Sequence, residues 1–148
     1  MYKHVLVATD GSRLAAKGVK AGVKLAKSLG ARLSAVYVIA PYVPPMYGEG
    51  AIYVPALAPQ EYRKISEKQA RKLLGSVARQ AGAAGVRCAT QFVTDPQPWQ
   101  GILRVARSRK CDMIAMATHG RSGLGGLILG SETTRVLAHS KIPVLVTR

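Results

Sequence analysis

A glycine-rich segment between Thr118 and Gly130 has the composition of a turn that binds an anion. Its first four glycines are Gly120, Gly123, Gly125 and Gly126, and Gly130-Ser131 begin a predicted helix. Glycines let backbone N–H groups approach an oxyanion, and a helix N-terminus adds about half a positive charge. Phosphate is the expected ligand, with Arg121 and Ser131 as further donors. A second interpretation stays open, in which the glycines only form a flexible loop and Ser131 only caps its helix.

A second polar turn, Thr9-Asp10-Gly11-Ser12, follows the apolar run His4 to Thr9. A carboxylate in this position accepts hydrogen bonds from sugar hydroxyls in dinucleotide-binding folds. If the strands that precede the two turns are neighbours, both turns line one crevice. The pair therefore predicts a site for a ligand that carries both a sugar and a phosphate.

The remaining chain alternates strand-like and helix-like patterns, which predicts an α/β fold. Apolar, β-branched runs predict strands at 4–9, 32–39, 86–93, 112–117 and 144–146. Amphipathic segments predict helices between Ser12 and Gly30, at 60–81, from Pro96 onward and at 131–140. Right-handed crossovers make this order an open, doubly wound parallel sheet with helices on both faces. Such sheets bind ligands at the carboxyl ends of their strands.

Several residues indicate where these elements begin and end. Ser12 is expected to cap the first helix and Gly30 to stop it. Asp95-Pro96 predicts an N-cap followed by a proline at the first helical position of the third helix. The alternating pattern of 86–93 indicates a strand at an edge of the sheet.

The 148 residues fit a single domain, 1–148, with a loop insertion at 40–59. This loop contains five prolines, three tyrosines and one charged residue, Glu49. Neither a helix nor a central strand tolerates so many prolines. The loop is expected to cover a ligand, to pack on a partner subunit or only to shield the end of the sheet.

The charge is strongly positive, with 22 Lys and Arg against 7 Asp and Glu, a net charge of +15 and a pI near 10.4. Lys17, Lys20, Lys24 and Lys27 recur at helical spacing and predict one solvent-facing stripe. Such a field attracts polyanions. No helix-turn-helix or aromatic RNA-binding motif is present, so nonspecific, salt-sensitive nucleic-acid association is the form of binding that stays open.

Other classes of protein find little support in the sequence. Cys88 and Cys111 have no metal-binding spacing and are expected to be two small buried residues. No apolar run reaches about 18 residues, and no signal peptide is recognisable. A cytoplasmic, soluble protein without a membrane segment is therefore expected.

Four segments together resemble the universal stress protein family, in the order and spacing typical of it. The likeness extends over essentially the whole chain. The segments are Val5-Leu6-Val7-Ala8-Thr9-Asp10-Gly11-Ser12, Met116-Ala117-Thr118-His119-Gly120-Arg121-Ser122-Gly123, Leu129-Gly130-Ser131 and Ile142-Pro143-Val144-Leu145-Val146.

The resemblance implies an adenine nucleotide alpha hydrolase-like fold, with five parallel strands in the order 3-2-1-4-5. It also implies a homodimer that pairs through the last strand, here 142–147. A separate physical reason favours that dimer, because an apolar strand at the edge of a sheet invites pairing. The family contains ATP-binding and non-binding groups.

The binding group carries Gly, two residues, Gly, nine residues and then Gly-Ser or Gly-Thr. Gly120 and Gly130-Ser131 match this motif, whereas Ala117 stands at its first position. The extra methyl group of Ala117 is expected to weaken nucleotide binding rather than abolish it. The same matching gives a set of nucleotide-binding candidates: Ala8, Thr9, Asp10, Val38, Met116, Ala117, His119, Gly120, Arg121, Gly130, Ser131 and Glu132. Among them, Ala8, Val38 and Met116 would lie at the adenine, Asp10 at the ribose, and Gly120, Arg121, Gly130 and Ser131 at the phosphates.

Glu132 departs from the small or apolar residue that the family often has after Gly-Ser. A carboxylate in the first turn of a helix is itself stabilised by the helix dipole. Glu132 is therefore expected to compete with a phosphate, unless it points away or helps to hold a divalent metal such as Mg²⁺.

The resemblance implies a protein that binds ATP or AMP in stress response or signalling. Two alternatives stay open, a dimeric stress protein without nucleotide and a slow ATP hydrolase. The chain lacks the lysine of a P-loop, and only His119 and Asp10 are candidate general bases. Binding is therefore expected rather than efficient catalysis.

Overall fold

The computed structural model describes residues 1–46, 57–118 and 129–148, in which strands and helices alternate. The elements are β1 (His4–Ala8), α1 (Arg13–Leu29), β2 (Arg32–Ile39), α2 (Pro59–Ala83), β3 (Cys88–Thr94), α3 (Pro98–Ser108), β4 (Met113–Ala117), α4 (Ser131–His139) and β5 (Val144–Thr147). The predicted α/β class is confirmed. The predicted bounds differ by a few residues; β3, for example, begins at Cys88 rather than at Val86.

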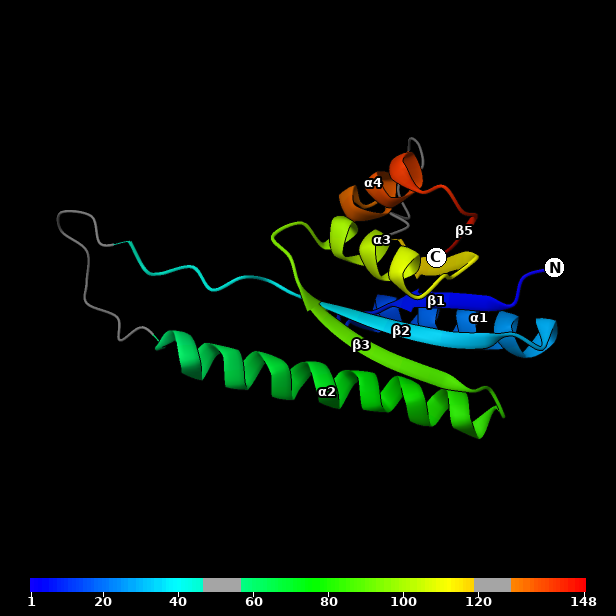
Figure 1. Ribbon diagram of the computed structural model, residues 1–148, viewed down its shortest axis with the longest axis horizontal. Coiled ribbons are helices and arrows are strands. Elements are labelled where there is room, and N and C mark those ends of the chain that lie inside the picture. Colours follow the sequence, from blue (N-terminus) through cyan, green and yellow to red (C-terminus); the bar gives the residue numbers. More distant parts are fainter. Residues whose placement is uncertain (47–56, 119–128) are drawn as a thin grey trace.

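The strands form one parallel sheet in the order β3-β2-β1-β4-β5, as predicted (Figure 1). β1 lies between β2 and β4, with Ala8 opposite Val36 and Val7 opposite Ala115. The strand order reverses at β1, because β2 extends to one side of it and β4 to the other. The carboxyl ends of β1 and β4 are therefore adjacent, which brings the two polar turns to one place. β3 and β5 are the edge strands.

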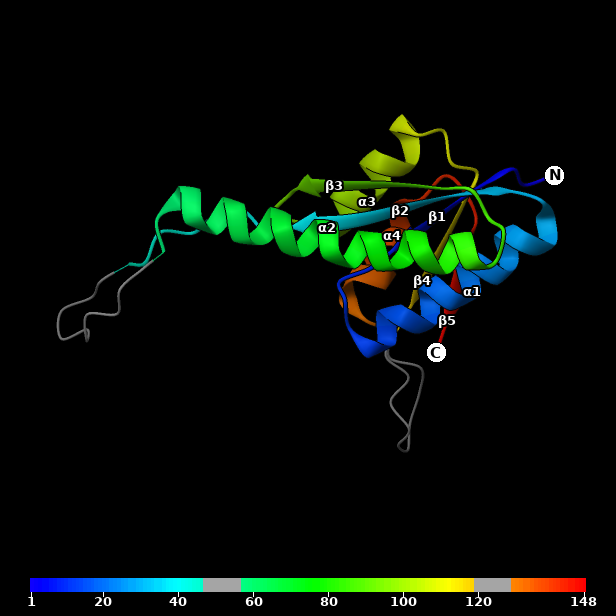
Figure 2. The ribbon, with the colours of Figure 1, turned by 90° about the horizontal axis from the view of Figure 1, so that it is seen from below.

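Helices cover both faces of the sheet (Figures 1 and 2). Alternate residues of β1 separate the two cores: Val5 and Val7 pack with α1 and α2, whereas Leu6 packs with α3 and α4. All three side chains are fully buried. Each face buries mainly Val, Leu, Ile and Ala, as the low aromatic content of the sequence requires.

Helix α1 has the ends that the sequence predicts. The Ser12 hydroxyl accepts a hydrogen bond from the backbone nitrogen of Ala15 at 3.0 Å, and Gly30 ends the helix in the left-handed conformation. Gly18 allows α1 to lie directly on β4, because a Cβ there would be 2.7 Å from the backbone nitrogen of Ala117. This close approach fixes the position of the strand end at the site.

The prediction for the start of α3 is wrong. The helix begins at Pro98 with Gln97 at the N-cap, two residues after Pro96. Asp95 accepts a hydrogen bond from the Gln97 backbone nitrogen at 2.9 Å, and its other oxygen lies 3.2 Å from Arg104. The carboxylate therefore forms a turn before the helix rather than capping it, and Pro98 takes the place expected for Pro96.

Two tyrosines join the described ends of the 40–59 loop. The Tyr62 hydroxyl donates to the Ala40 carbonyl oxygen at 2.6 Å, and the Tyr42 hydroxyl donates to that of Leu57 at 2.9 Å. This region extends away from the sheet together with the start of α2 (Figures 1 and 2). Residues 47–56, which include Tyr47 and Tyr53, lie outside the described residues.

The described surface carries the predicted lysine stripe, and Lys17, Lys20, Lys24 and Lys27 are all exposed. Cys111 is buried as predicted, and burial raises the pKa of its thiol to about 11. Cys88 is only half-buried, because it lies on the edge strand β3. Within the described ranges, no helix has the length and apolar character needed to cross a bilayer.

Candidate functional site

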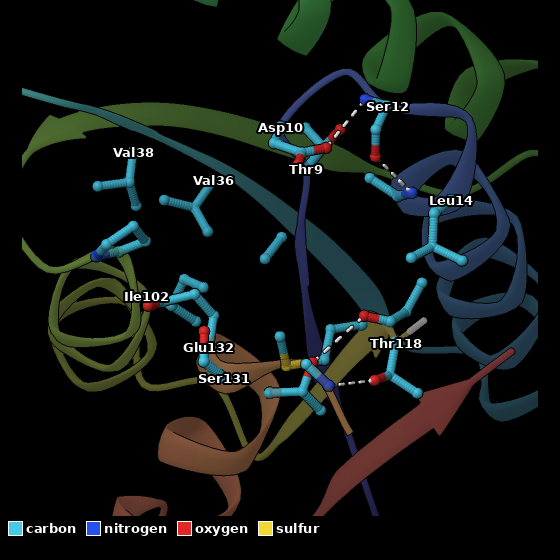
Figure 3. A pocket seen from close by; sticks show the side chains of 17 residues that line it. Thr9, Asp10, Ser12, Leu14, Val36, Val38, Ile102, Thr118, Ser131 and Glu132 are labelled. Carbon is cyan, nitrogen blue, oxygen red and sulfur yellow. Dashed lines mark hydrogen bonds between the residues drawn. The ribbon is translucent and has the colours of Figure 1, made fainter. Parts of the chain in front are cut away.

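A cavity of about 350 Å³ lies at the carboxyl ends of β1, β2 and β4 (Figure 3). All the predicted site residues that the structure describes line it: Ala8, Thr9, Asp10, Val38, Met116, Ala117, Gly130, Ser131 and Glu132. The other three predictions, His119, Gly120 and Arg121, lie outside the described residues. The structure therefore brings Asp10, Gly130 and Ser131 to one cavity.

The turn after β1 is held by its own side chains. The Asp10 carboxylate accepts a hydrogen bond from the Ser12 backbone nitrogen at 2.9 Å, and the Thr9 hydroxyl accepts one from that of Gly11 at 3.1 Å. Gly11 has φ +81°, a conformation that side chains rarely adopt. The Thr9 backbone nitrogen also donates to the Val36 carbonyl oxygen at 3.1 Å. The exposed Asp10 carboxylate is thus positioned at the rim of the cavity before any ligand arrives.

The start of α4 is anchored to the end of β4 through Thr118, which is 2% exposed. Its hydroxyl oxygen accepts a hydrogen bond from the Gly130 backbone nitrogen at 2.9 Å. One of the amides expected to bind an oxyanion is therefore already occupied. The following first-turn amides of α4 have no intrahelical acceptor and face the same end of the helix. Gly130 is the N-cap and Ser131 the first helical residue, so the interpretation of Ser131 as a cap is wrong.

Apolar side chains form the inner walls of the cavity. Val36 and Val38 come from β2, Ile102 comes from α3, and Met116 comes from β4. Gly101 allows α3 to approach this wall, because a Cβ there would lie 2.9 Å from Val38 Cγ2. An apolar slot next to a carboxylate and a helix N-terminus suits a flat heterocycle that is joined to a polar group.

Eight further lining residues were not predicted: Ser12, Leu14, Ala15, Val36, Pro98, Ile102, Thr118 and Thr133. Ser12 and Thr118 belong to the two polar turns, so the sequence is sufficient to predict that they lie near the site. Ile102 and Pro98 carry no such signal, because only the packing of α3 against the sheet brings them to the cavity.

Glu132 points toward the N-terminus of α3. One carboxylate oxygen accepts a hydrogen bond from the Trp99 backbone nitrogen at 2.8 Å, and the other lies 3.6 Å from Arg135. The Trp99 ring lies 4.4 Å from that of His139, between centroids, so α3 and α4 are in contact there. Glu132 still lines the cavity but does not fill it. Among the described residues, no group of three or more His, Cys, Asp or Glu side chains could hold a metal.

Comparison with known proteins gives one consistent result. The profile of the universal stress protein family matches residues 1–148. Universal stress protein YxiE of Bacillus subtilis is 34% identical over 149 residues, covering 100% of both chains. A universal stress protein of Methanocaldococcus jannaschii is 30% identical, covering 100% of this chain and 83% of its own length.

Solved structures agree with the sequence relatives. A member of the universal stress protein family from Burkholderia pseudomallei has a TM-score of 0.76 at 25% identity, covering 99% of this chain and 96% of its own. A universal stress protein in complex with cAMP has a TM-score of 0.71 at 22% identity, covering 99% and 97%. One from Archaeoglobus fulgidus in complex with dAMP has a TM-score of 0.66 at 17% identity, covering 99% and 98%. The chain therefore belongs to the universal stress protein family.

Proposed function

We propose that the protein binds an adenine nucleotide, such as ATP or AMP, at the carboxyl ends of β1, β2 and β4 and acts in stress response or signalling. One observation carries the proposal: Asp10, the apolar slot and the N-terminus of α4 line the same cavity. Its volume of about 350 Å³ falls within the range of small-molecule sites, about 300 to 1,000 Å³.

Each part of a nucleotide has a chemical counterpart in this cavity. Val38, Met116 and Ile102 offer apolar surface to the adenine ring. The Asp10 carboxylate is placed to accept hydrogen bonds from ribose hydroxyls. The first-turn amides of α4, which have no acceptor within the helix, and the Ser131 hydroxyl suit a phosphate. Gly120 and Arg121 complete the phosphate part of the proposal through the family resemblance alone.

The structures solved with cAMP and dAMP support an adenine nucleotide as the ligand class, because both are family members of the same fold. Mg²⁺ belongs to this proposal only together with a di- or triphosphate, which would bring most of its oxygen ligands. Isothermal titration with AMP, ADP and ATP tests the proposal. Binding of at least one of them supports it, and no heat and no thermal shift with any of them contradicts it.

A second candidate function is association with polyanions at the amino ends of the strands, on the opposite side of the sheet from the cavity. Lys3, Arg32, Arg87 and Lys110 line a hollow of about 520 Å³ where β1 to β4 begin. The carboxylate in its lining, Asp112, already accepts hydrogen bonds from the Lys3 and His4 backbone nitrogens.

Gel shifts with single-stranded DNA at about 50 and 200 mM salt test this second function. Phosphate contacts lose affinity steeply over that range. A double substitution, Arg32→Gln with Arg87→Gln, should weaken the shift. The matched pair Arg63→Gln with Arg71→Gln on α2 should not, because both of those arginines pair with Glu67. Equal losses in the two pairs would indicate an effect of total charge only.

The homodimer remains a proposal that rests on β5. This strand lies at an edge of the sheet, and Leu145 on it is 37% exposed. An apolar edge strand pairs readily with a second copy. The cytoplasmic location stays a prediction.

A further inference from the structure

The Glu132 carboxylate lies where the first turns of two helices meet. It belongs to the first turn of α4, and it accepts a hydrogen bond from the Trp99 backbone nitrogen, in the first turn of α3, at 2.8 Å. Both helix starts also line the cavity, through Pro98 from α3 and through Ser131 from α4. Figure 3 shows Glu132 beside Ser131 and Ile102, across the cavity from Asp10.

This carboxylate lies at the helix N-termini whose positive ends would attract a second or third phosphate. Each helix N-terminus carries about half a positive charge, and together they would offset about one negative charge. Glu132 already supplies that charge from within the protein. Its hydrogen bond to α3 also uses one of the amides that an anion would need.

The lining of the cavity has an unusual charge for this protein. Its described residues include two carboxylates, Asp10 and Glu132, and no Lys, Arg or His. The chain as a whole carries a net charge of +15. These two carboxylates place negative charge beside the bound ligand, and each additional phosphate increases the repulsion from Glu132.

We propose that Glu132 is a specificity-determining residue that makes the site prefer an adenine nucleotide with one phosphate group over di- and triphosphates. This inference rests on the proposed nucleotide-binding function. Glu132 supplies a fixed negative charge where the N-termini of α3 and α4 meet. The single phosphate of the ligand binds beside it at the remaining first-turn amides of α4.

The variant Glu132→Gln tests the inference, because the amide oxygen of glutamine can still accept the Trp99 hydrogen bond while the charge is removed. Isothermal titration in EDTA gives dissociation constants for AMP and ATP. The wild type should bind AMP more tightly than ATP. Glu132→Gln should strengthen ATP binding about tenfold and AMP binding less, as expected for one removed carboxylate charge near a polyanion.

Glu67→Gln is the matched control, since Glu67 lies on α2 and pairs with Arg63 and Arg71 away from the cavity. It should leave the ratio of the AMP and ATP dissociation constants unchanged. The wild-type ratio of the AMP and ATP dissociation constants is a measurement that does not depend on the variant's folding.

Three results would overturn the inference while leaving the proposed function intact. They are tighter binding of ATP than of AMP by the wild type, an unchanged ratio in Glu132→Gln, and a gain in ATP affinity with Mg²⁺ that Glu132→Gln abolishes. The last result would make Glu132 a metal ligand. Failure of the wild type and Glu132→Gln to bind any nucleotide would overturn the proposed function itself.

Discussion

The Thr118 hydroxyl oxygen accepts a hydrogen bond from the Gly130 backbone nitrogen at 2.9 Å, which joins the end of β4 to the start of α4 across twelve residues. Replacing Thr118 by Val keeps the shape of the side chain but leaves the partly buried Gly130 amide without its acceptor. We expect the free energy of unfolding to fall by about 1 to 3 kcal/mol and nucleotide affinity to fall with it. Urea denaturation and calorimetric titration measure the two effects.

Thr134→Val is the control for this prediction, because the Thr134 hydroxyl also contacts Gly130 but is exposed to solvent. Its effect on unfolding should stay within about 0.5 kcal/mol. Equal losses in the two variants would show that the partly buried hydrogen bond of Thr118 has no special role.

Ala117 lines the cavity, and the family resemblance predicts that nucleotide-binding members have glycine at this position. Ala117→Gly should bind AMP about tenfold more tightly, since one methyl group in a pocket is worth about 1 kcal/mol or more. Ala115→Gly, two residues earlier in the buried part of β4, should lower stability without this gain. Titration calorimetry compares the three proteins, and an unchanged or weaker affinity in Ala117→Gly would show that the methyl group does not obstruct the ligand.

Stability should depend on pH through His4, which is 5% exposed and whose ring Nε2 lies 2.8 Å from the Ser34 hydroxyl. Burial lowers the pKa of His4, and the charge of Arg32 lowers it further against the opposing charge of Asp112. The charge and the backbone of Arg109 act in opposite directions on the same ring. The folded protein therefore keeps this imidazole neutral at a pH where the unfolded chain binds a proton.

The sign of the effect follows from that difference. Between the unfolded pKa, about 6.5, and the lower folded pKa, the unfolded state holds more protons, so stability falls as the pH falls. The slope from this one group is at most about 1.4 kcal/mol per pH unit. NMR titration of the His4 ring together with urea denaturation at pH 5 to 8 checks the prediction. A ring that titrates at or above pH 6.5 in the folded protein would refute it.

The proposed dimer depends on the apolar edge at β5. Leu145→Lys places a charge on that edge, which natural edge strands use to prevent pairing. The wild type should sediment as a dimer at micromolar concentration and Leu145→Lys as a monomer. Ile65→Lys is the control, since Ile65 is 52% exposed on α2, which packs on β2 and β3. Loss of the dimer in both variants would point to a different interface.

The parts of the fold that depend on local patterns could be predicted from the sequence. The apolar run of β1, the Ser12 cap and the Gly30 stop each act through residues a few positions apart. The start of α3 was misplaced because Asp95-Pro96 and Gln97-Pro98 offer similar local signals. In the folded protein Asp95 pairs with Arg104 of the helix, a contact that neither dipeptide indicates.

The sequence predicts the two polar turns of the site, but it does not predict the contacts between elements that are distant along the chain. Asp10 and Ser131 stand in motifs that the sequence displays, so their approach followed from the strand order. The hydrogen bond from Trp99 to Glu132 joins residues 33 positions apart, and no local sequence pattern predicts it. The same holds for Ile102, whose place in the cavity depends on how closely α3 packs against β2.

Titration of isotopically labelled protein with AMP, followed by amide NMR, tests the central claim most directly. Nucleotide binding at the carboxyl ends of the strands predicts shifts for the amides of Asp10, Ala117 and Ser131. The amide signals of Lys3 and Arg87, at the amino ends of the strands, should not shift. Shifts confined to the amino ends of the strands, or no shifts at millimolar AMP, would contradict the account.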